Sequence, residues 1–515
     1  MARHSTLKKI TAIILGTLAI LLLIVLLFGE KWAKRFINHK MSRVEAIAYD
    51  SIAIEVIDQQ ITFYNISTHQ KAIDIEVKIL RINDLNLFNL VFFDRYDIGN
   101  ITLDSAKVNY RMGKRQSEDR KSIPDLRIGN IEVENSLMTI YKNQQPVLHT
   151  QFELRLKDID QKSLARSRQL LPKITYAKLK ELIYFNNAYY TTSLGEATYY
   201  EDIIDLQHLA YTSTQDKLAL GRDAGHEKDW INMKIDSAIL NVDHLGRLIY
   251  DHDVSKVFLF EGDLHVFRDK RLPFPENQRP PLLKELLANS INDFKIDSIF
   301  VINADIVYEE WVAEEPRPGK VTFNNMNGYF SNIYTYNHAP QKPAHLVMKS
   351  KLFNETNLYV DVSFPLTVKG NTHVKGHLEA MDLTTFNQML AYVTPVRIKR
   401  GQLSALDFNF SYGMTESTGE MHFNYTNLQI AFRDVRGRER AYPSSNGFLN
   451  SIKTWIANTF VLGKKNTADQ KSYRVGAISY NRNPQKSMFN FWWNSLLTGF
   501  KSSTGIIPKA ETEEE

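Results

Sequence analysis

Two stretches of this chain repeat one another, and the repetition constrains the fold more than any other feature of the sequence. Residues 98–110 read IGNITLDSAKVNY, and residues 128–141 read IGNIEVENSLMTIY. A third stretch, IDSIFVINADIVY at residues 296–308, follows the same plan of a polar turn-forming head and a β-branched run. Self-similar segments indicate repeated supersecondary units, so we expect a protein built from repeated β-units.

Within each copy the apolar positions change parity once. In the second copy Ile131 and Val133 are followed by Met138 and Ile140, with Asn135 between the two pairs. Strand side chains alternate faces with period two, so this change predicts a turn or a β-bulge at the Asn or Ser of each copy. The apolar residues that precede the change in the other two copies are Ile101, Leu103, Ile299 and Val301.

The composition excludes several classes of function. Aromatic residues make up 11% of the 515 residues, and Tyr, Phe and Ile favour strands over helices. The chain has no cysteine, which rules out disulfides, thiolate catalysis and Cys-ligated zinc. The net charge of +5 is small and no block of like charge stands out, so we expect no nucleic-acid partner.

The amino terminus has the pattern of a membrane anchor. Residues 10–29 are twenty uncharged residues, long enough to cross a bilayer, and follow a short stub at residues 1–9. The alternative is a cleaved signal peptide, but the run is long and no small-residue cleavage site follows it. Trp32 and Lys34 have the character of interfacial anchors. Basic residues after the run oppose export, yet long domains cross largely regardless of charge, so we expect an exported body.

The rest of the chain divides by composition. Residues 30–267 are strand-like, with a helical insert expected near 160–190, where SLARSRQLL and YAKLKELIYF show 3–4 spacing. Residues 268–293 carry four prolines and a short helical segment, and we take them as a linker and the main domain boundary. Residues 294–435 form a second β module, with a helix over LTTFNQMLAYV and a long hairpin from 403 to 432.

Residues 436–515 form a tail that contains one amphipathic segment. Trp492 and Trp493 lie among apolar residues at 3–4 spacing, with a lysine near each end of the segment. Such a helix suits a bilayer interface. It suits equally a cap that covers an open sheet end. The sequence leaves both interpretations open.

No motif for catalysis stands out. The chain lacks GxSxG, HExxH, P-loop and GxGxxG-after-strand patterns. His373 and His377 are four residues apart, but in a strand they would be about 13 Å apart, too far to share one metal. We therefore predict no catalytic residue, no metal and no cofactor, and we rank a hydrolase on an all-β scaffold lowest among the alternatives.

The apolar faces of the predicted strands must be covered. A second layer of protein would give closed β-sandwiches, whereas a curled sheet would give a trough whose apolar lining is covered by lipid. The sequence pattern is the same in both cases, and the anchor and the repeats favour the trough. The residues expected to line it are Ile101, Leu103, Ile131, Val133, Ile299, Val301, Phe408, Phe410 and Phe423.

The chain resembles the AsmA-like family of bacterial envelope proteins. The likeness rests on the anchor, on the IGNIEVENSLMTIY unit, and on VKGHLEAMDLTTFNQMLAYVTPVRIKRGQLSALDFNFSYG. In the last segment a strand and a Gly lead to a short helix and then to an Ile-x-x-Gly-x-Leu pattern, at Ile398, Gly401 and Leu403. The resemblance implies an elongated β-groove of the bridge-like lipid transfer type and brings no catalytic residues with it.

We therefore predict a mostly-β protein with minor helices, in which an N-terminal transmembrane helix precedes an elongated, curled antiparallel β-groove. Its predicted function is lipid binding and passive lipid transfer in support of phospholipid transport to, and integrity of, the outer membrane. The body would lie in the periplasm on a single-pass inner-membrane anchor, with phospholipids and envelope proteins as partners. The alternative is a structural envelope scaffold of closed β-sandwiches without lipid.

Overall fold

The computed structural model describes most of the chain. The described residues are 35, 47–55, 58–70, 72–86, 89–90, 93, 95–113, 125–275, 278–290, 293–313, 315–335, 342–365, 367–394, 396–433, 439–440 and 464–505. The predicted membrane segment 10–29 lies outside these residues, as do Trp32 and Lys34. Among the helices within the described ranges, none combines the length and hydrophobicity that a membrane crossing requires.

The protein is mostly β and divides into two compact units. Unit 1 comprises residues 1–186, 193–204 and 244–246, and unit 2 comprises residues 187–192, 205–243 and 247–515. The chain passes from one unit to the other within β9 (Tyr190–Tyr200) and β10 (Ile203–Ser213). The prediction of a mostly-β protein with minor helices is thereby confirmed.

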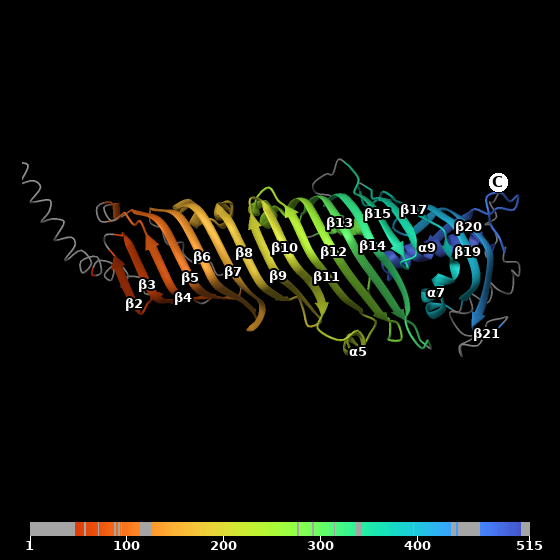
Figure 1. Ribbon diagram of the computed structural model, residues 1–515, viewed down its shortest axis with the longest axis horizontal. Helices are drawn as coiled ribbons and strands as arrows, with labels where there is room; N and C mark the ends of the chain where they lie inside the picture. The colour runs from red at the N-terminus through yellow and green to blue at the C-terminus, as the bar shows by residue number, and fades with distance from the viewer. Residues whose placement is uncertain are drawn as a thin grey trace, which may run out of the picture. The chain divides into compact units, whose positions relative to one another are not determined.

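Unit 1 contains a sheet whose neighbouring strands follow one another in the chain (Figure 1). Its strands are β1 (Ile47–Ala48), β2 (Ser51–Glu55), β3 (Gln60–His69), β4 (Ile73–Asn83), β5 (Tyr96–Met112), β6 (Leu126–Lys142), β7 (Gln145–Asp160) and β8 (Ile174–Phe185). Between β7 and β8 the chain forms α3 (Gln161–Ala165), α4 (Ser167–Leu170) and the 3-10 turn η1 (Leu171–Lys173). Asp160 caps α3 through its side chain, which accepts a hydrogen bond from the Ser163 amide.

Unit 2 contains a longer run of paired strands. They are β11 (Asp229–Asn241), β12 (Asp253–Asp269), β13 (Lys295–Trp311), β14 (Gly319–Tyr334), β15 (His345–Leu352), β16 (Thr356–Ser363), β17 (Thr372–Leu378), β18 (Met381–Asp382), β19 (Val396–Tyr412), β20 (Glu416–Arg433), β21 (Glu439–Arg440) and β22 (Gly476–Asn481). The helices are α5 (Ala219–Ala224), the π-turn η2 (Arg247–Asp251), α6 (Leu283–Asn289), the 3-10 turn η4 (Leu383–Phe386), α7 (Asn387–Val393) and α9 (Met488–Ser503). The predicted helix between two strands is thus present as η4 and α7, and the predicted hairpin as β19 and β20.

The sheets are mixed and not purely antiparallel as predicted. Strands β5 and β6 pair in parallel, and so do β12 and β13. This parallel pairing explains the repeated tetrapeptide IGNI of residues 98–101 and 128–131, because Ile98 lies beside Ile128 and Asn100 lies beside Asn130. Parallel neighbours need a crossover connection, and the Pro-rich residues 270–294 are the connection between β12 and β13.

The Pro-rich segment is therefore a crossover within unit 2 and not the predicted domain boundary. The predicted tail is likewise no separate part. Strand β22 pairs with β20, and Phe491 of α9 is 1% exposed in the core of that unit. The composition of the chain does change at both places, but it did not reveal that the strands on either side of each change lie together.

The parity changes are β-bulges, as predicted. Ser105, Asn135 and Asn303 all have positive φ, at 56°, 48° and 57°. The register between β6 and β7 shifts between Val133 and Ser136 at the same point. Asn is the non-glycine residue that tolerates this left-handed conformation best. Each bulge keeps the apolar residues on both of its sides on one face of the sheet.

The prediction of helix for the second part of residues 160–190 was wrong. Residues 161–165 and 167–170 are α-helical and residues 171–173 form a 3-10 turn, whereas YAKLKELIYF lies in strand β8. Ala177 and Leu179 alternate as in a strand, but Glu181 has a φ of 51° and moves the next apolar residue of that face to Leu182. A bulge therefore produced the 3–4 spacing that resembles an amphipathic helix.

Candidate functional site: the apolar faces of the sheets

One face of the unit 1 sheet carries five apolar rows. The rows, read from β4 through β5 and β6 to β7, are Ile73/Tyr110/Ile140/Leu148, Ile75/Val108/Met138/Thr150, Val77/Ala106/Ser136/Phe152, Leu80/Leu103/Val133/Leu154 and Ile82/Ile101/Ile131/Leu156. The two polar members, Ser136 and Thr150, are fully buried and donate hydrogen bonds to backbone carbonyl oxygens. The opposite face is polar and includes the row Arg81/Thr102/Glu132/Arg155.

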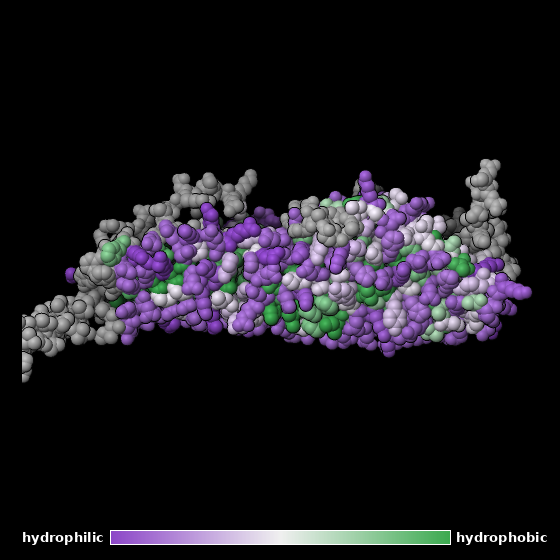
Figure 2. All heavy atoms as spheres, turned by 90° about the horizontal axis from the view of Figure 1, so that it is seen from above, coloured by the Kyte–Doolittle hydropathy of each residue, from purple (hydrophilic) through white to green (hydrophobic). Residues whose placement is uncertain are grey.

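The row at the bulge, Val77/Ala106/Ser136/Phe152, is largely buried, and the rows on either side of it are only half-buried. Ile101, Leu103, Ile131 and Val133, all predicted to line a groove, are neighbours in two of the rows and all retain solvent exposure. Cover is found at the strand ends, where Leu170 of α4 packs against a small core cluster. Within the described part of unit 1, no second sheet packs on these rows. Hydrophobic residues remain visible between hydrophilic ones on the surface in Figure 2.

Unit 2 also carries five rows on one face of β11 to β14, although its opposite face carries a row of aromatic rings at Phe258, Phe300 and Tyr329. The rows are Leu240/Val257/Ile299/Phe330, Ala238/Leu259/Val301/Gly328, Ile235/Gly262/Ala304/Met326, Met233/Leu264/Ile306/Phe323 and Ile231/Val266/Tyr308/Val321. The predicted residues Ile299 and Val301 are half-buried here. Small residues occupy the bulge row in both units, and a Cβ on Gly262 would lie 3.1 Å from the Cβ of Ala304. The bulge row is therefore the most closely packed part of each face.

Charged side chains end the apolar face of unit 2 at both ends of the strands. At one end Asp229, Arg268 and Glu310 form the next row after the five apolar ones. Arg268 donates two hydrogen bonds to Asp229, of 2.6 and 2.5 Å, and Lys270 lies 2.7 Å from Glu310. At the other end the Lys295 ammonium lies 3.2 Å from Asp297.

Burial and hydrogen bonding shift the pKa values of Arg268 and Tyr308 at the first of these edges. Burial alone would lower the pKa of Arg268, but the hydrogen bonds to Asp229 raise it above its ordinary value. Burial, with the Glu310 carboxylate nearby, raises the pKa of Tyr308, whose hydroxyl donates to Glu310 at 2.8 Å. The paired charges of this row mark a sharp border between apolar and polar surface.

The three predicted phenylalanines lie in a closed core and not on an open face. Phe408, Phe410 and Phe423 are 8%, 2% and 4% exposed. Helix α9 covers them, and the rings of Phe423 and Phe500 approach to 4.9 Å between centroids. We therefore remove these three residues from the predicted lining. The burial of one sheet face by a helix fell outside the sequence pattern, which is the same for covered and uncovered strands.

The two tryptophans of α9 have different surroundings. Trp492 packs against the rings of Phe410 and Tyr412, so it belongs to the core and its prediction as an interfacial residue was wrong. Trp493 is 38% exposed, next to Phe489 at 72%. Of the two interpretations that the sequence left open, the cap describes the position of the helix, and Trp493 points away from what the helix covers.

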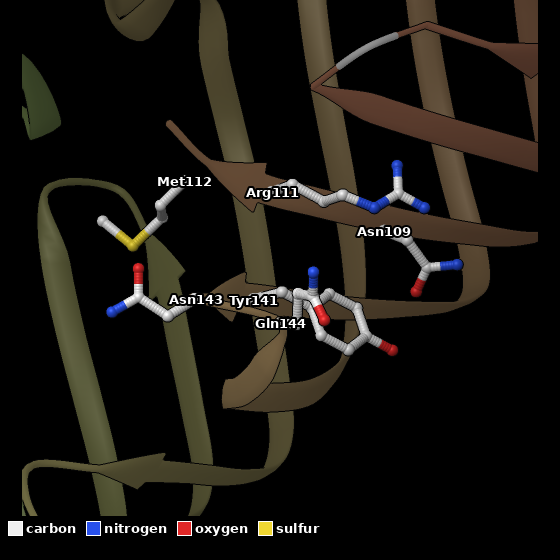
Figure 3. A pocket seen from close by; sticks show the side chains of 6 residues that line it. All are labelled: Asn109, Arg111, Met112, Tyr141, Asn143 and Gln144. Atoms are coloured by element: carbon white, nitrogen blue, oxygen red, sulfur yellow. The ribbon is translucent and has the colours of Figure 1, made fainter. Parts of the chain in front are cut away.

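A pocket of about 410 Å³ lies at the ends of β5 and β6 in unit 1. Met112 and Asn143 lie on one side of it, and Arg111 and Asn109 on the other (Figure 3). Asn109 and Tyr141 belong to the polar face, since Tyr110 and Ile140 belong to the apolar one. The Arg111 guanidinium is paired with Asp74. Met112 follows Tyr110 by two residues and so continues the apolar face, which means that the pocket lies at the strand ends and borders both faces.

The described residues contain no cluster of His, Asp and Glu that could hold a metal ion. His373 and His377 point to the polar face of β17, where the first lies 2.8 Å from the Ser411 hydroxyl and the second 2.7 Å from Asp407. The charged border of Asp229, Arg268 and Glu310 was missed by sequence reasoning. A register that continues the alternation past the bulges would have placed all three residues on the apolar face.

Comparison with known proteins identifies no relative. No protein-family model matches the chain, and no curated protein matches it.

Proposed function

We propose that this protein binds lipid acyl chains against the apolar faces of its sheets and passes lipid along them without catalysis. One observation carries the proposal: in each unit the apolar rows on either side of the buried bulge row are largely half-exposed. Exposed apolar area of this extent is costly, at about 25 cal/mol per Å². Contiguous apolar patches on soluble proteins mark sites of interaction.

A lipid matches the arrangement better than a protein segment does. An acyl chain gains about 0.8 kcal/mol for each methylene that it buries, and it needs no hydrogen-bonding partner on the sheet. The charged borders at Asp229, Arg268 and Lys295 offer a wet edge beside which a polar headgroup stays hydrated. The bulge row contains small residues, such as Gly262 and Ala304, which leave space above this row for an acyl chain.

The setting that we propose is a bacterial envelope. The uncharged run at residues 10–29 supports a single-pass inner-membrane anchor with the body in the periplasm. The resemblance of the repeated unit and of residues 374–413 to the AsmA-like family supports phospholipid transport toward the outer membrane and maintenance of that membrane. Phospholipids are the proposed cargo, and other envelope proteins are proposed as partners.

A scaffold without lipid is the second candidate, and one observation favours it. Over β16 to β22 the apolar face is fully closed by α6, α7 and α9, which together bury Val362, Phe410 and Met421. This part of unit 2 has the packing of a structural core. In a scaffold, a partner protein would cover the half-exposed rows of unit 1 and of β11–β14 in the way that the helices cover β16 to β22.

Site-specific photocrosslinking of the full chain separates the two candidates. A benzophenone amino acid at Val133 or at Val301 reports from the apolar face, and the same residue at Glu132 or at Asp305 reports from a polar position on the opposite face of the same strand. We expect phospholipid adducts, detected by mass spectrometry after irradiation in membranes, at the first pair and at least fivefold fewer at the second. Val133→Asp and Val301→Asp should reduce the lipid that co-purifies with the protein.

Adducts to protein alone at Val133 and Val301 would favour the scaffold and overturn lipid binding. Equal lipid labelling of both faces would mean that the crosslinker samples surrounding bilayer, which would also count against a bound lipid. Glu132→Asp and Asp305→Asn serve as matched variants, since they change the opposite face only.

A further inference from the structure

Helix α9 has an apolar stripe on the side that faces away from the sheet. The stripe that packs on the sheet has four residues at a spacing of four: Phe491, Ser495, Gly499 and Ser503, all buried. A step of two residues turns a helix by about 200°. The outward stripe therefore consists of Phe489, Trp493, Leu497 and Lys501.

Capping the sheet does not explain this outward stripe. A helix that only covers a core presents polar residues to solvent, whereas Phe489 is 72% exposed and Trp493 is 38% exposed. The buried stripe uses small residues so that the helix lies close to β22. A Cβ on Gly476 would overlap the Gly499 carbonyl oxygen. The docking of α9 is thus complete without the outward aromatic residues.

The segment that contains α9 is basic, whereas the last ten residues of the chain, 506–515, contain one Lys and four Glu. Residues 464–505 contain seven Lys or Arg residues and a single acidic residue, Asp469, for a net charge of +6. The whole chain has a net charge of +5, so the remaining residues together are slightly acidic. Lys464, Lys465, Lys471 and Arg474 are exposed. Helix α9 itself contains no acidic residue.

Two of these cations lie at the carboxyl-terminal end of the outward stripe. The Arg474 guanidinium packs against Gly505, within one turn of Lys501. Burial lowers the pKa of Lys501, and in the described part of the chain no carboxylate forms an ion pair with it. One cation there is accounted for by the helix dipole. The surplus charge next to exposed aromatic rings calls for an anionic, apolar partner.

We propose that the outward stripe of α9 and its basic flank dock on the surface of an anionic phospholipid bilayer. Aromatic rings at the headgroup level and lysines on anionic headgroups are the two contributions to interfacial binding. The exposed Phe489 and Trp493, together with the exposed cations of the same segment, favour a bilayer as the occupant, and a second copy of the chain is an outcome of the test. The site is separate from residues 10–29, and the proposal stands whether or not the sheet faces hold lipid.

The test measures binding of the full chain, held in nanodiscs of neutral phosphatidylcholine, to added vesicles in a flotation assay. We expect binding to vesicles with 30% phosphatidylglycerol and at least tenfold weaker binding to pure phosphatidylcholine vesicles. Raising the salt from 50 to 300 mM should weaken it, since exposed charges are screened. The variant Phe489→Ser/Trp493→Ser should lose at least fivefold.

The control is Tyr329→Ser/Val347→Ser, which removes two exposed hydrophobic side chains, at 38% and 41%, from the sheet of the same unit. We expect this control to change vesicle binding less than twofold. A second variant, Lys501→Glu, keeps the aromatic residues and should weaken binding to anionic vesicles only. Lys375→Glu, on β17, is its control.

Equal binding to neutral and anionic vesicles, or an unchanged Phe489→Ser/Trp493→Ser variant, would overturn the proposal. So would a variant that dissociates self-assembled protein in light scattering while vesicle binding stays the same, because the occupant would then be a second copy. Lipid adducts at Val133 and Val301 are measured on the same variants. If a variant that no longer docks still gives these lipid adducts, docking and acyl-chain binding are independent. If the adducts are absent while vesicle docking is intact, only acyl-chain binding is refuted.

Discussion

Asn100 on β5 and Asn130 on β6 lie side by side in the parallel pair, and the Asn130 side-chain amide donates a 2.7 Å hydrogen bond to the Asn100 side-chain oxygen. Both residues belong to the repeated tetrapeptide. The Asn100 amide in turn lies 3.3 Å from Asp84. The repetition of Asn in the sequence therefore has a structural cause, since equal residues in a parallel register can bond in a ladder.

We predict that the Asn100–Asn130 contact holds the register of β5 and β6. Asn130→Ala should lower the free energy of local opening of this strand pair by about 1 kcal/mol, because a part-buried hydrogen bond contributes about that much. Hydrogen exchange of peptides from both strands measures the opening. A double-mutant cycle with Asn100→Ala should give a coupling of about 0.5 kcal/mol or more. Additive effects of the two changes would show that the ladder does not set the register.

The bulge at Asn135 should be sensitive to β-branched residues. Its φ of 48° is costly for valine, so Asn135→Val should destabilise β6 by about 2 kcal/mol. Asn135→Gly should cost less, since only the 3.0 Å bond to Asp104 is lost. Thr139→Val, in the regular part of the same strand, is the control and should be close to neutral. Equal losses at both positions would argue against backbone strain as the cause.

Gly476 should control whether α9 stays on the sheet. Gly476→Val places atoms where the Gly499 carbonyl and the Ser503 hydroxyl lie, so the helix must move outward. We expect faster hydrogen exchange across residues 488–503 and new exposure of Met421, which is fully buried. Ala477→Val is the matched control, because its side chain is exposed on the other face of β22. Unchanged exchange in α9 would contradict the close approach.

The stability of unit 2 should fall in acid partly through Asp269. The hydrogen bonds from Arg271, at 2.8 and 2.7 Å, lower the pKa of this buried carboxyl below its ordinary value of 3.8. A lowered carboxyl pKa stabilises the fold at pH above the unfolded value, and the stabilisation is lost as the pH falls through the folded value.

Asp269→Asn should therefore destabilise unit 2 at pH 7 and matter progressively less below about pH 4. Thermal unfolding followed between pH 7 and pH 2 measures the difference. Asp263→Asn, at an exposed position of the same strand, serves as control and should show no such pH-dependent gap. A gap for Asp269→Asn that stays constant down to pH 2 would indicate lost packing and not lost charge.

The sequence revealed the strands and their bulges because both depend on local rules. The parity change around Asn135 and Asn303 is visible in the order of residues, and the positive φ follows from it. The same rule misled us at Glu181, where one bulge turned the alternation of β8 into a helix-like spacing. A period can be read locally, but whether a shifted period means a bulge or a helix depends on neighbouring strands.

What lies across the sheet from a residue could not be read in this way. Val133 and Phe410 have equivalent patterns in the sequence, yet one is half-exposed and the other lies beneath α9. The difference arises from a helix about 80 residues downstream of Phe410. The parallel pairing of β12 with β13 was hidden for the same reason, since a proline-rich crossover resembles a linker in composition.

The parallel pair β5 and β6 also bears on how such a protein changes in size. Each strand of the pair presents the same rows to its neighbour, with Ile101 beside Ile131 and Leu103 beside Val133. A strand with its crossover can thus be copied and inserted in register, and the strands on either side meet the same surface as before. Evolution can lengthen or shorten this architecture by whole units while the apolar lane keeps its width.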